Sequence, residues 1–202
     1  MNKIPKIALT LVCLYFTGQS AHLLAQGYTV NAQISSQAAG DGTYNYTILL
    51  QNSGSSSQSI SQFWFAWVPY GGYGYDLLPS APTVNSEPDG WYSYTDNQSY
   101  YYSDGYSIDF LNYYGSSLAP GQTDTFTFNS PDSPTTLGLD QPDGVTSPYY
   151  DTPMLTSYVY NDTGTDPGTQ FVVAVAAVPE PSTLALLGVS AAGLMLRFRK
   201  KN

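Results

Sequence analysis

The clearest pattern in the chain is an alternation of apolar and polar residues that begins at residue 28. In residues 28–35 the apolar side chains occupy every second position, and residues 43–51 repeat the pattern. A period of two residues is typical of a strand with one buried face. Gly40, Asp41 and Gly42 lie between the two segments and suit a hairpin turn. The pattern therefore predicts an antiparallel hairpin.

The remainder of the middle region consists of short apolar segments separated by turn residues such as Pro-Asp-Gly. Residues 63–68 form a continuous apolar run, which predicts a central strand covered on both faces. We expect further strands at residues 91–94, 106–111, 124–128, 157–160 and 170–176. No segment here has a convincing helical period. About eight short strands with regular turns predict an all-β domain, an antiparallel β-sandwich of the immunoglobulin-like type.

The N-terminal segment has the features of a secretory signal peptide. Lys3 and Lys6 precede an apolar run over residues 7–16, and Ala25 supplies a small residue for cleavage. We therefore expect residues 1–25 to be a signal peptide, handled by the secretion translocon and signal peptidase. The β-sandwich domain is expected to cover residues 26–177.

The C-terminal segment contains a second apolar stretch, at residues 184–196. Thirteen residues form a helix of about 20 Å, which predicts a single short transmembrane helix. A basic cluster follows it and is expected to stay on the cytoplasmic side of the membrane. The cluster consists of Arg197, Arg199, Lys200 and Lys201.

A proline-rich motif stands directly before this stretch: Val178, Pro179, Glu180, Pro181 and Ser182. The motif, the short apolar helix and the basic end together resemble the PEP-CTERM sorting signal of Gram-negative bacteria, over residues 178–202. The resemblance implies an exported protein that is transiently held in the inner membrane and recognised by an exosortase. It also implies delivery to the cell surface or the extracellular space, among bacteria that produce exopolysaccharide.

Charge is distributed very unevenly along the chain. All six Lys and Arg residues lie at positions 3–6 or 197–201, whereas fourteen of the fifteen acidic residues lie between Asp41 and Asp166. A domain without basic residues cannot neutralise phosphates, so nucleic acid is excluded as a partner. Cys13 is the only cysteine and falls in the signal segment, so the exported domain is expected to contain no disulfide.

The same composition predicts that the middle domain is not an enzyme and has no cofactor. Residues 26–177 contain no His, Cys or Lys, the residues that most nucleophilic and general-base mechanisms require. A paired-carboxylate glycosidase remains as a distant alternative, and Asp109 is the acid that a strand would position. Asp162 and Asp166 form a weak calcium candidate without the spacing of an EF-hand, and we predict no metal site.

Aromatic residues are abundant in the middle domain, where eleven tyrosines lie between Tyr70 and Tyr114. An amphipathic ring stacks on a sugar while its polar tip stays hydrated. Our leading hypothesis is a structural or adhesive component of surface or biofilm material. The alternative is a carbohydrate-binding module that contacts exopolysaccharide. Its candidate contact residues are Trp91, Tyr92, Tyr94 and Tyr101.

Overall fold

The structure of the chain is a computed structural model. It describes residues 28–70, 73–97, 105–113, 115, 117–139, 152–161 and 168–176. The expected signal peptide, the sorting motif, the C-terminal helix and the basic cluster all lie outside these residues. Within the described part of the chain, no helix is long and apolar enough to cross a membrane.

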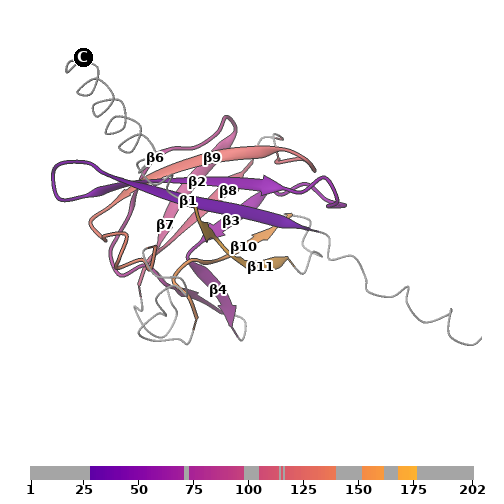
Figure 1. Cartoon of the computed structure of the whole chain (residues 1–202). Helices are drawn as coiled ribbons and strands as arrows, with labels where there is room; N and C mark the ends of the chain where they lie inside the picture. Colours follow the sequence, from indigo (N-terminus) through magenta and orange to yellow (C-terminus); the bar gives the residue numbers. More distant parts are fainter. Residues whose placement is uncertain are drawn as a thin grey trace, which may run out of the picture.

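The described residues form β-strands and connecting turns (Figure 1). The strands are β1 (Val30–Ala38), β2 (Tyr44–Asn52), β3 (Gln62–Phe65), β4 (Trp67–Tyr70), β5 (Tyr73–Asp76), β6 (Thr83–Ser86), β7 (Trp91–Asp96), β8 (Ser107–Asn112), β9 (Thr123–Ser130), β10 (Thr156–Tyr160), β11 (Thr169–Val172) and β12 (Ala174–Val175). The all-β class predicted from the alternating pattern is therefore confirmed.

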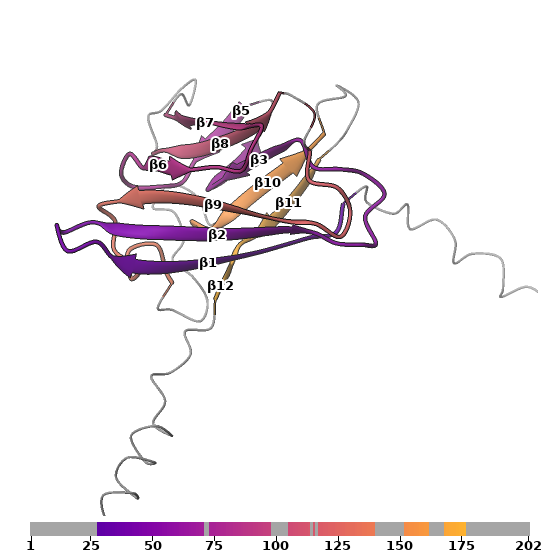
Figure 2. The same ribbon diagram turned by 90° about the horizontal axis from the view of Figure 1, so that it is seen from above.

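Two five-stranded sheets make up the sandwich (Figures 1 and 2). The first, here called the β1 sheet, has the order β12-β1-β2-β9-β6. The second, the β3 sheet, has the order β11-β10-β3-β8-β7, and β4 pairs with β5 in a separate hairpin. All pairings are antiparallel except that of β1 with β12.

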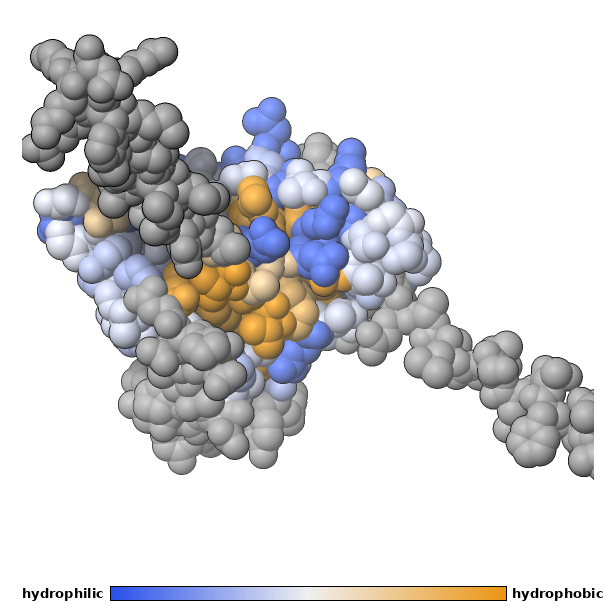
Figure 3. All heavy atoms as spheres, viewed as in Figure 1, coloured by the Kyte–Doolittle hydropathy of each residue, from blue (hydrophilic) through white to orange (hydrophobic). Residues whose placement is uncertain are grey.

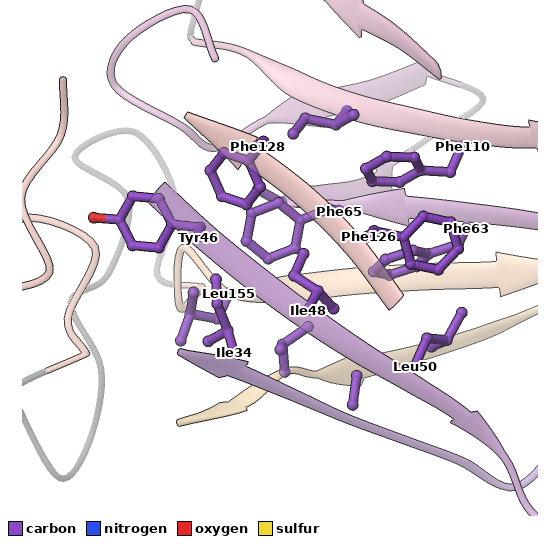
Figure 4. Close-up of a cluster of buried hydrophobic side chains, with 14 of the residues drawn as sticks. Ile34, Tyr46, Ile48, Leu50, Phe63, Phe65, Phe110, Phe126, Phe128 and Leu155 are labelled. Carbon is purple, nitrogen blue, oxygen red and sulfur yellow. The ribbon is translucent and has the colours of Figure 1, made fainter. Parts of the chain in front are cut away.

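The core between the sheets is dominated by phenylalanine (Figure 4). Phe63 on β3, Phe110 on β8 and Phe126 on β9 meet there, with ring centroids 4.5 Å apart for Phe110 and Phe126. Tyr46 stacks on Phe128 at 4.9 Å, and its hydroxyl donates a 2.6 Å hydrogen bond to the carbonyl of Asp132. Aromatic pairs at these separations stabilise the core beyond their area burial, and the hydrogen bond satisfies the buried phenol.

The expected hairpin at the start of the domain is confirmed. Alternate side chains are buried along β2 and in the first half of β1, and the register pairs Ala32 with Leu50 and Ile34 with Ile48. In the connecting turn, Asp41 accepts hydrogen bonds from the backbone and hydroxyl of Thr43. The alternation therefore determines which face of this hairpin is buried.

The apolar run at residues 63–68 differs from the expectation of one continuous strand. It is interrupted at Ala66, the only non-glycine residue with a positive φ in the described part of the chain (57°). Ala66 is fully buried, and the chain continues from it into β4, which leaves the β3 sheet to pair with β5. The sequence pattern shows apolar character but does not show an interruption of the strand of this kind.

The last strands move from one sheet to the other. β11 pairs with β10 in the β3 sheet, and β12 then runs parallel to β1 in the β1 sheet. The residue between them, Val173, is buried, and its N–H donates a 3.0 Å hydrogen bond to the carbonyl of Leu155. The single segment expected at residues 170–176 is therefore two short strands that join the edges of both sheets.

Candidate functional site

The outward side of the β3 sheet carries aromatic side chains in register. Because Phe63, Phe65, Phe110 and Val159 point into the core, the residues that alternate with them point outward. Backbone pairing sets these outward residues in two rows across the strands. One row is Tyr158, Trp64, Asp109 and Tyr94, and the other is Tyr160, Gln62, Leu111 and Tyr92. We call these eight residues, together with Trp67, the aromatic face.

The two tryptophans of the aromatic face stack on each other. Their ring centroids are 4.8 Å apart, with an interplanar angle of 29°. Residues 64 and 67 would lie on opposite faces of a regular strand, since side chains alternate. The positive φ at Ala66 changes this alternation and brings Trp67 beside Trp64. An extra residue that redirects a side chain is the usual effect of a β-bulge.

Two glycines hold the rings in place. A Cβ atom added to Gly74 would overlap the indole of Trp67, and one added to Gly168 would overlap the ring of Tyr158. The indole of Trp67 and the phenol of Tyr158 are themselves edge-to-face, at a centroid distance of 5.5 Å. The backbone at these glycines therefore forms part of the surface against which the aromatic face is packed.

A buried carboxylate lies in the middle of the first row. Asp109 is only 8% exposed, although its strand position directs it away from the core. Gln62 Nε2 donates hydrogen bonds of 2.8 Å to both carboxylate oxygens. Burial raises the pKa of Asp109 to about 7; the bonds from Gln62 oppose this increase, and the negative charge of Asp96 adds to it. A perturbed carboxylate among aromatic rings has the features of a binding site.

The far side of the aromatic face is more open to solvent. Tyr92 is 44% exposed and Tyr94 is 54% exposed, and Tyr113 is also exposed. The rings of Tyr92 and Tyr113 are edge-to-face, with centroids 6.2 Å apart. The aromatic face therefore combines a packed tryptophan pair with half-exposed tyrosines. Asp109 and Leu111 on β8 lie between these two parts.

The prediction that Trp91 contacts carbohydrate is wrong. It is 3% exposed and packs edge-to-face on Phe126 in the core, at 5.2 Å. Its indole nitrogen forms no hydrogen bond of standard geometry within the described part of the chain. The indole nevertheless approaches Asp124, where it opposes the increase in pKa that burial causes. Trp91 contributes to the hydrophobic core rather than to a surface.

The other predicted site residues divide into two groups. Tyr92 and Tyr94 lie on the aromatic face, two residues apart on β7. The remaining ones lie outside the described residues, namely Tyr101, Asp162, Asp166, the sorting motif and the basic cluster. Among the residues described, no group of three His, Cys, Asp or Glu side chains is placed to hold a metal.

Trp64, Trp67 and Tyr158 were not predicted to belong to a surface site. Trp64 alternates with the buried Phe63 and Phe65, so strand alternation was the available signal. The continuous apolar run concealed it, because such a run is typical of a strand covered on both faces. The position of Trp67 depends on the backbone at Ala66 and has no sequence signal.

A separate apolar area lies on the side of the molecule that Figure 3 shows. Hydrophobic residues gather in the middle of that view, with hydrophilic residues above them and to their right. Val172 on β11 and Val175 on β12 are among the exposed large hydrophobic residues of the chain.

A hollow on the outer side of the β1 sheet is lined mainly by polar side chains. Its lining residues are Asn31, Gln33, Gln51 and Thr123, with Ala32 and Leu49.

Comparison with known proteins gives one family match. The family model of the PEP-CTERM protein-sorting motif matches residues 177–200. No curated protein matches the chain. A similar solved structure is the solution structure of the chitin-binding domain of Chi18aC from Streptomyces coelicolor. It is 17% identical with a TM-score of 0.33, and the alignment covers 50% of this chain and 78% of that one. A similarity of this extent carries no argument about ligand.

The family match confirms the resemblance based on residues 178–202. Such a motif implies an exported protein that an exosortase sorts at the membrane. The motif follows directly on the last described strand, because β12 ends at Val175 and the match begins at residue 177. The chain is thus a β-sandwich protein that carries a PEP-CTERM protein-sorting motif at its C-terminal end.

Proposed function

We propose that the β-sandwich is a non-catalytic carbohydrate-binding domain, which the sorting motif delivers to the cell surface or the extracellular matrix. The observation that supports this function is the pair of outward rows on the β3 sheet. Exopolysaccharide is the partner we propose, because a long polymer matches a site that crosses four strands. The exported domain would then be an adhesive link between the cell and this polymer.

The chemistry of the two rows suits a sugar. Exposed phenol rings such as Tyr92 and Tyr94 offer apolar faces on which the C–H side of a pyranose stacks. Gln62 and Asp109 supply amide and carboxylate groups between the rings, and such groups hydrogen-bond to hydroxyls. A mostly apolar surface with a few fixed polar groups is the usual composition of a ligand site.

A structural or adhesive role without specific sugar binding is the second candidate. It is favoured by the mutual stacking of Trp64 and Trp67, since these rings cover part of each other. In that case the aromatic face would stabilise the β4–β5 hairpin and would not bind a ligand. The two candidates differ in whether the exposed tyrosines affect binding or only packing.

Binding is tested on the exported protein recovered from the producing cells, by native affinity electrophoresis. The gels contain either neutral hydroxyethylcellulose or the extracellular polysaccharide purified from the same cells. We expect at least one polymer to retard the protein. Replacing Tyr94 by Ala should weaken that retardation roughly two- to tenfold, the range expected for one aromatic contact.

Leu49→Ala is the matched control for this experiment. Leu49 is also exposed and large, but it lies on the outer side of the β1 sheet. Its replacement should leave the retardation unchanged. If neither polymer retards the wild-type protein, or if both variants behave alike, carbohydrate binding is wrong and the structural role is preferred.

The proposed route includes the secretion translocon, signal peptidase, a transient stay in the membrane and removal of the tail by an exosortase. Mass spectrometry of the intact exported protein tests this route. The measured mass should correspond to a chain without the first 25 or so residues and without the basic end. Replacing Glu180 should leave the tail attached and the protein in the inner membrane. Normal release of this variant would show that the exosortase does not recognise the motif that contains Glu180.

We further propose that the sandwich is immunoglobulin-like. Strands β1, β2, β9 and β6 would correspond to strands A, B, E and D of that fold, and β3, β10 and β11 to strands C, F and G. The β4–β5 and β7–β8 hairpins are then insertions on either side of strand D. The β7–β8 hairpin extends the second sheet and carries four of the nine residues of the aromatic face.

A further inference from the structure

The aromatic face has negative but no positive charge. Asp109 lies in its first row, and Asp96 is close enough to raise the pKa of Asp109. No lysine or arginine occurs between Lys6 and Arg197, so no basic side chain from the domain balances these acids. A ligand with carboxylate, sulfate or phosphate groups would meet only repulsion here.

The neighbours of Asp109 leave its charge without a cationic partner. Gln62 and Trp64 face it from β3, and Tyr94 and Asp96 face it from β7. All are neutral or acidic. Ser107 precedes Asp109 by two residues and therefore shares its face of β8. The hydroxyl of Ser107 is buried and has no hydrogen-bond partner within the residues that the structure describes.

We propose that the aromatic face selects polysaccharides that carry positively charged amino groups, and that Asp109 is the residue that recognises this charge. The inference rests on the proposed carbohydrate-binding function and specifies its substrate class. Trp64 and Tyr94 flank Asp109 in the same row. A cation at this position would lie beside aromatic side chains as well as a carboxylate.

Both contacts favour the same sign of charge. Indole and phenol rings attract ammonium groups through their quadrupoles, and the attraction is larger where water is partly excluded. A carboxylate that is 8% exposed is screened less by salt than one on an open surface. The exposed acids elsewhere in the domain provide only a weak and screened attraction, so selectivity should depend on Asp109.

Protons and bound cations should compete at this site. Since burial raises the pKa of Asp109 to about 7, the carboxyl is largely protonated below that pH. A permanently charged polymer should therefore bind more tightly as the pH rises from about 5 to about 8. A quaternary ammonium polymer makes this test clear, because its own charge does not change with pH.

The test uses three forms of one polymer with the exported protein at pH 8. They are hydroxyethylcellulose, its quaternary ammonium derivative and carboxymethyl cellulose. We expect the cationic form to bind roughly tenfold more tightly than the neutral form, and the anionic form to bind most weakly. The measured quantity is the ratio of the cationic to the neutral dissociation constant.

Two single-charge variants separate recognition from general attraction. Asp109→Asn should reduce the cationic preference roughly tenfold, whereas Asp41→Asn, in the exposed β1–β2 turn, should leave it almost unchanged. Equal effects of the two variants, or an unaltered preference in Asp109→Asn, would overturn the selection of charge but leave sugar binding intact. If no polymer binds to the wild type, and the cells' own polysaccharide does not bind either, both proposals are wrong.

Discussion

The two outer faces of this sandwich arise from the same alternating pattern but carry different side chains. On the β1 sheet most outward positions are polar, as in Gln33, Asn45, Thr47, Thr127 and Asn129, although Leu49 is an exposed apolar exception. Hydrogen bonds link some of these side chains to polar neighbours. Asn129 donates to the hydroxyl of Thr43 at 2.7 Å, and the hydroxyls of Thr127 and Ser86 are 2.8 Å apart. On the β3 sheet the outward positions carry tryptophan, tyrosine and a buried acid.

Stability does not require this difference. The inner sides of both sheets supply the hydrophobic core, and the β1 sheet shows that an outer side can consist mainly of hydroxyls and amides. The costly features lie on the other side: Ala66 has a positive φ, and Asp109 is a carboxylate with a pKa raised to about 7. Strain and perturbed ionisation are concentrated at functional sites. The comparison therefore supports the proposal that the β3 sheet, rather than the β1 sheet, carries the binding surface.

The largest effect should come from the backbone that positions Trp67. Ala66→Val places a β-branched side chain at a φ of 57° in a fully buried position. We expect a loss of about 3 kcal/mol in the free energy of unfolding, measured by urea denaturation. Ala38→Val is the control, at an exposed position of β1, and it should change the free energy of unfolding by less than about 0.5 kcal/mol. Equal losses would mean that Ala66 is not strained.

The next effect is a dependence of stability on pH. Asp109 keeps its proton up to about pH 7 in the folded state, whereas in the unfolded chain it ionises near its ordinary pKa of 3.8. Between these values the folded protein binds more protons than the unfolded one, so stability falls as pH rises from about 4 to about 7. Burial also raises the pKa of Asp124, which adds a contribution of the same sign.

Asp109→Asn should remove most of this dependence. At pH 8 the variant should be more stable than the wild type by on the order of 2 kcal/mol, and at pH 4 the two should be equal. The control Asp41→Asn should not stabilise the protein at pH 8, because hydrogen bonds from Thr43 lower the pKa of Asp41. Thermal unfolding of the wild type and both variants from pH 4 to pH 8 measures these differences. If the wild type is most stable at pH 8, Asp109 is not buried as a neutral carboxyl.

Regular alternation predicted the hairpin of β1 and β2 and its buried face, because there one local rule determines burial. Residues 67–86 include three strands that were not predicted. Pro69, Gly74 and Pro82 interrupt any period in that segment, and the pairing of β6 with β9 joins residues far apart in sequence. Sheet order of this kind depends on non-local contacts and leaves no periodic signal.

The site was predicted only in part, and the reasons are local. Tyr92 and Tyr94 were proposed together with Trp91, although adjacent residues of a strand point to opposite faces. Strand alternation alone would have separated Trp91 from them. Asp109 was singled out as the acid that a strand would position, but its burial could not be predicted, because it depends on Gln62, which is paired through a neighbouring strand.

A smaller effect is expected at Gly74. Adding a Cβ there would collide with the indole of Trp67, so Gly74→Ala should displace this ring and cost about 1 to 2 kcal/mol. Near-ultraviolet circular dichroism should report the loss of the stacked tryptophan pair. Gly54→Ala is the matched control, since no atom lies within 4 Å of its added Cβ. If the spectrum of Gly74→Ala is unchanged, then Trp67 does not rest on this glycine.

The smallest effect on stability, and the sharpest contrast between the faces, comes from exposed residues. Tyr94→Ala and Leu49→Ala each remove a large, half-exposed side chain, one from each outer side. Both should change the free energy of unfolding by less than about 0.5 kcal/mol, measured by urea denaturation. Because only Tyr94 belongs to the aromatic face, a loss of polysaccharide retardation in Tyr94→Ala at unchanged stability would show that its ring is used for binding. A comparable loss of stability without a loss of binding would instead show that the tyrosine is needed for packing alone.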